Sequence, residues 1–257
     1  MILAVDIGNS DIVYGWHYDG AWQHQLRVPV ENYVSAYGSL SQYVLEQGLA
    51  WARVEQMVIS SVVPGITPTV RNGLIQLSGR EPRQVSPALI ESLNLGIENT
   101  AEIGSDLVAN AVAGYACFGE SCIVVDFGTA LTFTVVSAQG HLQGVTIAPG
   151  LNTAMRALSS STAQLPQVPL ELPDSAIGSS TPHALQAGIM LGYVGLVKEL
   201  IERMRAELGQ SVKVVATGGL SRKLTPLADY FDRIDPCLTL EGLRLIALRT
   251  SQEGSGQ

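Results

Sequence analysis

One short pattern occurs twice in this chain, about half a chain apart. Residues 3–10 read LAVDIGNS, and residues 124–130 read VVDFGTA. In each copy a short apolar run ends in Asp-x-Gly followed by Asn or Thr, and a β-rich segment and a glycine turn come next. Such patterns are typical of strand–turn–strand units. The repeated pattern predicts two similar domains, 1–115 and 116–250, that face each other across a central cleft. Residues 251–257 are expected to form a disordered tail.

Strand and helix patterns alternate along both halves, which predicts an α/β architecture. We expect strands at 12–18, 56–63, 131–136 and 212–216, and helices at about 39–47, 67–77, 107–118, 182–208 and 241–250. The run 107–118 is small and apolar without proline, so it is expected to be a buried helix whose N-terminus lies at Ser105 or Asp106. The segment 159–180, rich in Ser, Thr and Pro, is expected to be a loop.

Composition narrows the class of protein. Of 257 residues 46% are hydrophobic and 15% are charged, which is ordinary for a compact α/β protein. Apolar stretches such as 122–125 are far shorter than the ~20 residues that cross a bilayer. The N-terminus has no basic leader and has an acid in its first apolar run. We therefore expect a cytoplasmic protein without a membrane segment.

Charge and cysteine content exclude further classes. The formal net charge is −8, the pI is near 5.0, and there is no Lys/Arg cluster, so nucleic acid is not an expected partner. Cys117, Cys122 and Cys237 form no closely spaced pair, which indicates inert thiols rather than a disulfide framework or a zinc site. An acidic protein can still bind ATP through backbone amides, helix N-termini and a divalent metal.

The residues of the first turn suit phosphoryl transfer, which is catalysed mainly by positioning and charge neutralisation. Asp6, at a strand end, would hold Mg²⁺ directly or through water. Gly8 would let the backbone approach the phosphates, while Asn9 and Ser10 would donate hydrogen bonds. A single Asp-x-Gly turn is more often a hairpin capped by its Asp, but two copies favour a phosphate site.

Two further turns extend this pattern. Asp126 with Gly128 and Thr129 would form a facing jaw, and the Thr-Gly-Gly of residues 217–219 could accept the adenosine end. Three glycine turns after three strands resemble the nucleotide site of the actin-like ATPase fold, which has two similar ribonuclease H-like domains. No Gly-x-x-x-x-Gly-Lys-Ser/Thr loop occurs in the sequence.

Several separate stretches, in order along nearly the whole chain, resemble the type III pantothenate kinases. They are Asp6–Ser10, Ser60–Pro64, Asn99, Gly104–Asp106, Val125–Ala130, Ile147–Gly150, Thr162–Pro166, Ile177–Gly178, Thr181 and Thr217–Leu220. The resemblance implies ATP-dependent phosphorylation of pantothenate, the first step towards coenzyme A. It also implies a homodimer that needs Mg²⁺ and a monovalent cation, K⁺ or NH₄⁺.

The resemblance also implies roles for particular residues. The ATP phosphate segment corresponds to Asp6, Ile7, Gly8, Asn9, Ser10, Asp11, Ile12 and Val13, with further nucleotide contacts at Thr129 and Gly218. The substrate-binding positions correspond to Gly104, Ser105, Asp106, Leu107 and Thr181. Asp126 corresponds to the monovalent-cation ligand, and Asp106 to the general base. Without that resemblance, an Asp at the start of an apolar helix is more often an N-cap.

One position departs from the family pattern, Gly-Ala-Asp-Arg, because this chain has Gly-Ser-Asp-Leu at residues 104–107. Leu107 cannot donate a hydrogen bond to the pantothenate carboxylate as the family Arg would. Arg156 could replace that cation, or it could be an ordinary solvated residue. Two alternatives to pantothenate kinase activity stay open: a kinase for another hydroxylated acceptor, and a non-catalytic homologue that binds nucleotide or a regulatory partner.

Overall fold

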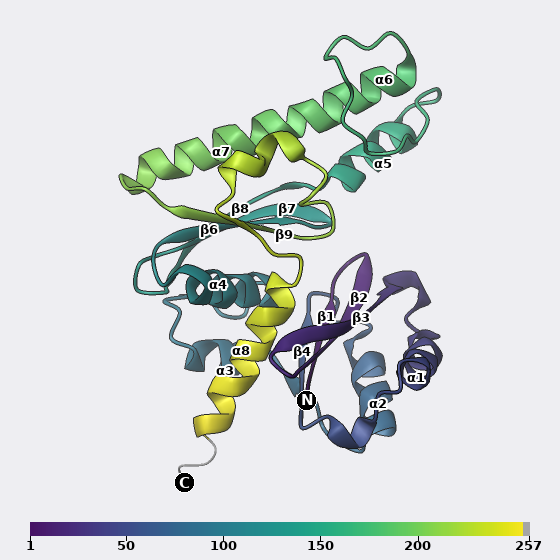
Figure 1. Ribbon diagram of the computed structural model, residues 1–257, viewed down its shortest axis with the longest axis vertical. Coiled ribbons are helices and arrows are strands. Elements are labelled where there is room, and N and C mark those ends of the chain that lie inside the picture. Colours follow the sequence, from purple (N-terminus) through teal and green to yellow (C-terminus); the bar gives the residue numbers. More distant parts are fainter. Residues whose placement is uncertain (254–257) are drawn as a thin grey trace. The chain divides into compact units, whose positions relative to one another are not determined.

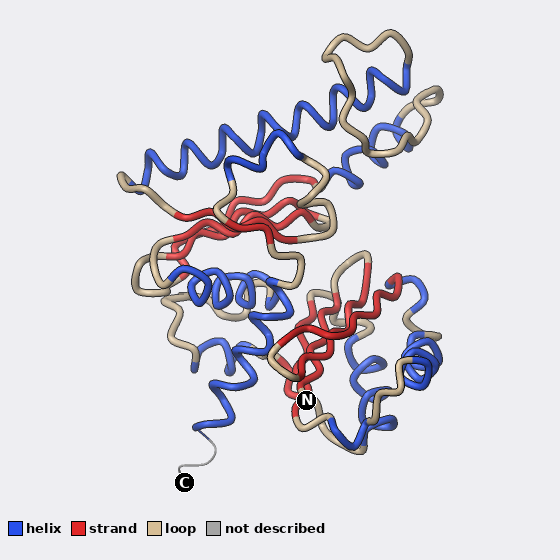
Figure 2. Tube along the Cα trace, in the orientation of Figure 1, coloured by secondary structure: helices blue, strands red, loops and turns tan. Residues whose placement is uncertain are grey.

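The computed structural model describes residues 1–253, and their contacts form two compact units (Figure 1). Unit 1 contains Met1–Ala113 together with the C-terminal helix from Cys237 onward, and unit 2 contains Gly114–Pro236. Each unit is built on one five-stranded sheet with helices packed against it (Figure 2). The predicted α/β architecture is therefore confirmed.

The elements of unit 1 are β1 (Ile2–Ile7), β2 (Asp11–Tyr18), β3 (Ala21–Pro29), η1 (Val30–Asn32), α1 (Ala36–Glu46), η2 (Trp51–Arg53), β4 (Gln56–Ser61), α2 (Thr67–Ser78), β5 (Arg83–Gln84), α3 (Pro87–Ser92) and α8 (Leu238–Glu253). Helix α4 (Ser105–Phe118) begins in unit 1 and ends in unit 2. The elements of unit 2 are β6 (Cys122–Phe127), β7 (Ala130–Val136), β8 (Leu142–Pro149), α5 (Leu151–Ser161), α6 (Thr181–Gln186), η3 (Ala187–Leu191), α7 (Gly192–Leu208), β9 (Lys213–Thr217), η4 (Thr225–Tyr230) and β10 (Arg233–Ile234).

The two sheets have the same topology. The strand order is β3-β2-β1-β4-β5 in unit 1 and β8-β7-β6-β9-β10 in unit 2. In each sheet the central strand, β1 or β6, pairs antiparallel with the strand that follows it and parallel with a strand that follows a helical crossover. The repeat seen in the sequence therefore extends to the order and direction of all five strands.

The period of two along a strand explains how the first sheet is buried on both faces. In β1, Leu3, Val5 and Ile7 belong to the hydrophobic cluster that contains residues of α1 and α2, whereas Ala4 belongs to the cluster that contains residues of α4 and α8. Asp6 alternates with these residues in the same way as Ala4. It therefore lies on the α4 and α8 face of the sheet.

The second sheet follows the same rule. Ile123, Val125 and Phe127 of β6 belong to one cluster with Val197 and other residues of α7, the long green helix that runs along the sheet in Figure 1. The intervening residues of β6 point to the opposite face. This places Asp126 in unit 2 at the position that Asp6 occupies in unit 1.

Helix α8 differs from the sequence-based division, which assigned residues 116–250 to the second domain. Leu243 and Ile246 are buried in the same cluster as Val108 and Val112 of α4, so the contacts of α8 belong to unit 1. The predicted tail at 251–257 overlaps the end of α8 at Glu253, and residues 254–257 lie outside the described part of the chain.

The predicted elements are found with shifted ends, and two helices, α3 and α5, were missed. α1 starts three residues before its predicted position, because the Ser and Gly in it weaken the helical signal. α5 lies partly in the predicted loop, where consecutive Ser residues concealed it. The predicted 182–208 helix starts one residue earlier and contains a short π-helical segment, η3.

The stretch Thr181–Leu208 is long and apolar enough to cross a membrane by length and composition alone. Tyr193, Val197 and Ile201 in it are buried against the sheet of unit 2. A core helix of a globular domain passes the same test, so this helix is weak evidence for a membrane span.

The close contact between α8 and α4 predicts a strong effect of one added methyl group. A Cβ at Gly242 would overlap the carbonyl group of Ala109, so Gly242→Ala should lower the free energy of unfolding by roughly 1–3 kcal/mol. Gly195→Ala in α7 is the matched control: its Cβ would meet nothing within 4 Å, and the change should stabilise by about 0.4–1 kcal/mol. Urea unfolding of both variants tests this, and equal effects would contradict the packing described for α8.

Candidate functional site

In unit 1 a carboxylate and a buried hydroxyl lie side by side on the first sheet. Asp6 of β1 is paired with Ser60 of β4 in parallel register, so both side chains point to the face covered by α4 and α8. Asp6 is half-buried, whereas Ser60 is fully buried. Both residues stand one position before the end of their strands. This edge of the sheet is where parallel strands commonly place a ligand site.

The turn after β1 is closed by main-chain hydrogen bonds. The Gly8 N–H donates to the Asp11 carbonyl at 2.9 Å, and the Val30 N–H donates to the Ser10 carbonyl at 2.8 Å. Asn9 is exposed at the tip, with Gly8 and Ser10 half-buried beside it. The turn therefore presents backbone and short polar groups.

The side chains of Ile7, Ile12, Val13 and Asp11, also in the predicted phosphate segment, are engaged in packing or in an ion pair. Ile7 and Ile12 are buried in the cluster with α1 and α2, so only their backbone atoms could reach a ligand. Val13 contacts the cluster on the opposite face. The Asp11 carboxylate forms an ion pair with Arg27 at 3.0 Å.

The start of α4 is fastened to β4 by the hydroxyl of Ser105. Ser105 Oγ lies 2.9 Å from Ser60 Oγ, accepts the Ser61 N–H at 2.9 Å, and donates to the Ser61 carbonyl at 3.2 Å. Ser105 is buried, so these bonds are shielded from water. They fix the first turn of α4 against the strand that carries Ser60, next to Asp6.

Asp106 lies inside the first turn of α4, one residue after its start, rather than at the N-cap. Its Oδ1 accepts the Leu107 N–H at 2.8 Å. Gly104 precedes this turn, and a Cβ there would overlap the Asp106 carboxylate. Burial raises the pKa of Asp106 above its ordinary value, and this effect exceeds the opposing effect of two backbone N–H groups. A carboxyl group whose pKa is raised is a common property of a general base.

Leu107 follows Asp106 and is half-buried. It belongs to none of the three hydrophobic clusters formed by the described residues. Its side chain therefore has no evident structural requirement to be apolar.

In unit 2 the carboxylate of Asp126 lies between two glycines. A Cβ on Gly218 would approach Asp126 Oδ1 to 2.6 Å, and a Cβ on Gly128 would lie 3.7 Å from the same atom. Gly218 has a φ of 88°, which an L side chain rarely adopts. The Thr129 carbonyl accepts the Gly150 N–H at 3.0 Å and the Thr153 hydroxyl at 2.6 Å, so this turn is fixed against α5.

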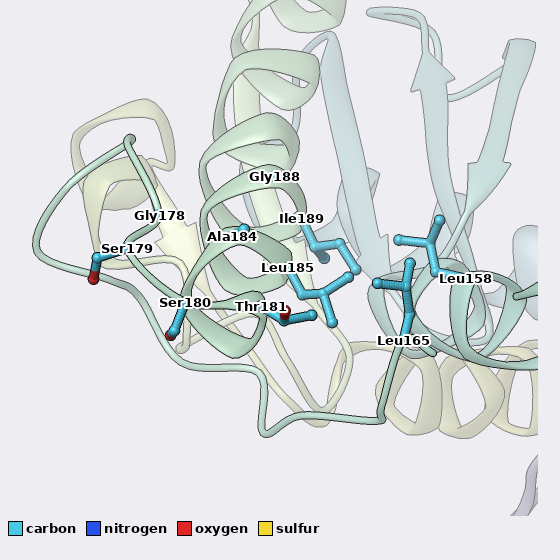
Figure 3. A pocket seen from close by; sticks show the side chains of 10 residues that line it. All are labelled: Leu158, Leu165, Gly178, Ser179, Ser180, Thr181, Ala184, Leu185, Gly188 and Ile189. Carbon is cyan, nitrogen blue, oxygen red and sulfur yellow. The ribbon is translucent and has the colours of Figure 1, made fainter. Parts of the chain in front are cut away.

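Thr181 lies at the start of α6, in a different part of unit 2. Ser180 caps this helix by accepting the His183 N–H at 3.4 Å. Figure 3 shows Thr181 beside Leu185 at one wall of a cavity of about 640 Å³, with Leu158 and Leu165 across from them. Arg156, the alternative cation, is exposed on α5.

Most of the predicted site residues thus form one group in each unit, whereas Thr181 lies in a different part of unit 2, at the cavity beside α6. Asp6, the turn after β1, Ser105 and Asp106 are brought together in unit 1, and Asp126, Gly128 and Gly218 in unit 2. Ser60 was given no role of its own from the sequence, and Thr217 was named only as part of the Thr-Gly-Gly turn that could accept the adenosine end. Both could have been found from one feature: a hydroxyl residue near the end of a strand that pairs in parallel with a strand that carries an Asp.

The described residues contain no group of three or more His, Cys, Asp or Glu side chains placed to hold a metal ion. A metal here would therefore need further oxygen ligands, such as those of phosphates.

Comparisons with known proteins agree over most of the chain. A family model described as type III pantothenate kinase matches residues 2–203. A type III pantothenate kinase of Treponema pallidum subsp. pallidum is 43% identical over 255 residues, covering 96% of this chain and 93% of that protein.

Two solved structures show the fold. A Baf family transcriptional activator from Campylobacter jejuni has a TM-score of 0.62 at 21% identity, covering 97% of this chain and 99% of that one. A 2-dehydro-3-deoxygalactonokinase protein from Sinorhizobium meliloti has a TM-score of 0.57 at 13% identity, covering 97% and 96%. The predicted actin-like ATPase fold, shared with sugar kinases, is confirmed.

The raised pKa of Asp106 predicts how its replacement changes stability. Between the unfolded pKa, about 3.9, and the higher folded value, the folded protein binds more protons, so the contribution of Asp106 to stability falls as pH rises. Asp106→Asn keeps an oxygen acceptor for the Leu107 N–H and should raise the melting temperature at neutral pH. The gain should shrink towards about pH 4. Asp229→Asn, at an exposed position, is the control; a lower melting temperature for Asp106→Asn at neutral pH would contradict the effect of burial.

Proposed function

Because this chain belongs to the type III pantothenate kinase family, we propose that it transfers the γ-phosphoryl group of ATP to the hydroxyl of pantothenate with Asp106 as the base. It is an ATP-dependent pantothenate kinase, and the reaction is the first step of coenzyme A biosynthesis. The observation that carries the role of Asp106 is its geometry: Ser105 ties it to the strand next to Asp6, and burial raises its pKa.

The turn after β1 is the proposed phosphate site. Gly8 lets the main chain approach phosphate oxygens, and Asn9 and Ser10 offer short polar side chains from the exposed side of the turn. Gly218 and Thr129 are the proposed nucleotide contacts in unit 2. The closed hydrogen bonds of the first turn support this role, because a preorganised loop need not be reordered when ATP binds.

The residues present fit a nucleotide-bound Mg²⁺. Mg²⁺ is usually held by one or two carboxylates and substrate phosphates, and Asp6 offers a half-buried carboxylate beside the phosphate turn. Bound Mg²⁺ would neutralise charge on the transferred group. Asp6 would set its position from the rigid end of β1.

Asp106 would act on the acceptor. The Leu107 N–H holds Oδ1 and so orients the carboxylate. As the acceptor oxygen forms its bond to the γ-phosphorus and the bond to the bridging oxygen of ADP breaks, the hydroxyl proton passes to Asp106. Burial favours this transfer, because it weakens the solvation of the charged carboxylate.

Three further assignments come from the family and belong to the same proposal. Asp126 would hold a monovalent cation, K⁺ or NH₄⁺, and its cradle of two glycines supports close approach of a small ligand. Thr181 would contact pantothenate at the cavity beside α6. The protein would work as a cytoplasmic homodimer.

Leu107 favours a second candidate function. A half-buried leucine offers no charge to a substrate carboxylate, so an uncharged hydroxylated acceptor would bind here at smaller cost than pantothenate. Arg156 is the cation that could serve pantothenate instead.

Replacement of the base should affect turnover far more than nucleotide binding. Asp106→Asn should lower kcat by about 10²- to 10⁴-fold, the usual contribution of a positioned general base, with little change in KM for ATP. Steady-state kinetics with ATP and pantothenate measure both constants. Asp229→Asn should behave as the native protein, and an Asp106→Asn enzyme of native kcat would exclude Asp106 as the base.

Restoring the family cation should improve pantothenate binding. A charge-assisted hydrogen bond contributes roughly 1.5–3 kcal/mol, so Leu107→Arg should lower KM for pantothenate by about 10- to 150-fold while the constants for ATP stay almost unchanged. Leu107→Met, which adds no charge, is the control.

The same kinetics with pantothenate and its uncharged amide analogues separate the alternatives. Tight pantothenate binding by the native enzyme that is lost in Arg156→Ala would identify Arg156 as the replacement cation. Turnover of an uncharged alcohol, with none of pantothenate by either protein, would favour the different acceptor.

A further inference from the structure

Thr217, the last residue of β9, carries a buried hydroxyl that none of the described residues satisfies. Its side-chain oxygen has no hydrogen-bond partner in this part of the chain, and the residue is only 1% exposed. Buried hydroxyls in proteins are nearly always paired, so an orphan of this kind calls for an unseen ligand, water or ion. The position of Thr217 distinguishes among these.

The strand register places this hydroxyl beside Asp126. Thr217 is paired with Asp126 in the parallel β6–β9 ladder, and Thr132 is paired with Asp126 in the antiparallel β6–β7 ladder. Paired residues on adjacent strands point to the same face, with strands about 4.8 Å apart. The carboxylate therefore has a hydroxyl residue on either side of it. Val125 and Ala216 point to the other face, into the cluster with α7.

The Asp126 carboxylate lies close to Gly218, the residue that follows Thr217. A Cβ on Gly218 would come within 2.6 Å of Asp126 Oδ1. The same Cβ would come within 2.7 Å of the Phe127 carbonyl oxygen. A carboxylate oxygen and a carbonyl oxygen thus lie close together at Gly218, the residue that follows Thr217.

The repeat gives an internal comparison. Ser60 in unit 1 is the counterpart of Thr217, since each is paired in parallel with the Asp of its central strand. The Ser60 hydroxyl is satisfied by Ser105 at 2.9 Å, whereas the Thr217 hydroxyl has no such partner among residues 1–253. The Ser60 hydroxyl therefore helps to hold helix α4, and the Thr217 hydroxyl must serve another purpose.

We propose that the Thr217 hydroxyl is a direct ligand of the monovalent cation that Asp126 holds. This inference rests on the cation site of the proposed function and adds a residue to it. Monovalent ions such as K⁺ are well served by neutral oxygens that replace their hydration shell. A site with one carboxylate and neutral oxygens fits such an ion better than a divalent one, for which the described chain offers no cluster of three acidic, His or Cys ligands.

The test is the melting temperature of the full-length protein in K⁺ or tetramethylammonium chloride at equal ionic strength, with and without a non-hydrolysable Mg²⁺–ATP analogue. K⁺ should raise the melting temperature of the native protein. In Thr217→Val, a replacement of similar shape, the apparent K⁺ affinity should fall by about tenfold or more. In tetramethylammonium this variant should melt no lower than the native protein, because the lost hydroxyl had no partner.

Two variants serve as controls. Thr217→Ser retains the hydroxyl and should retain the K⁺ effect. Thr134→Val removes another buried hydroxyl without a partner in the described chain, but one that is paired with Val124 rather than with Asp126, and it should leave the K⁺ effect unchanged.

The outcomes separate this inference from the function on which it rests. A K⁺ effect that survives in Thr217→Val but is lost in Asp126→Ala would overturn the role of Thr217 and leave the cation site standing. A Thr217→Val protein that melts lower in tetramethylammonium would show that the hydroxyl has a protein partner, which also overturns it. A native protein that does not respond to K⁺ in either nucleotide state would overturn the cation site and the role of Thr217 together.

Discussion

Parallel pairing of each central strand with its crossover partner positions the polar groups on which the proposed chemistry depends. Main-chain hydrogen bonds between β1 and β4 hold Asp6 beside Ser60, and those between β6 and β9 hold Asp126 beside Thr217. Apolar residues fill the remaining positions on both faces, so neither strand can slip by one residue without burying its carboxylate in a hydrophobic cluster. Core packing therefore sets the register, and the register sets the site.

The two repeats use the same framework for different tasks. In unit 1 the hydroxyl next to the Asp is used to fasten α4, which brings the proposed base to the end of the sheet. In unit 2 the equivalent hydroxyl is left without a partner in the described chain, and glycines surround the carboxylate. In the proposed function the first repeat therefore supplies the phosphate turn and the base, and the second supplies the cation site and further nucleotide contacts.

The first turn of α4 combines three functions in consecutive residues. Ser105 anchors the helix, Asp106 provides a carboxylate whose pKa is raised by burial, and Leu107 stands where the family pattern has an Arg. Only the first two make contacts that the fold requires. Leu107 lies outside the hydrophobic clusters of the described residues, so the proposed acceptor preference could change at this position while Asp106, the proposed base, stays in place.

The sequence alone determined the duplicated α/β fold and the family, and it predicted most of the residues of the proposed site, because these depend on short-range signals. An Asp-x-Gly turn after an apolar run is local, and so is a proline-free apolar helix such as 107–118. It did not determine that α8 packs with unit 1, since this depends on a glycine at 242 that admits the backbone of Ala109. Nor did it single out Ser60, or give Thr217 a role beyond its place in the Thr-Gly-Gly turn. A serine or threonine in a strand is unremarkable until the sheet pairs it with an aspartate from a distant segment, and only the tertiary structure decides which hydroxyl then finds a partner and which does not.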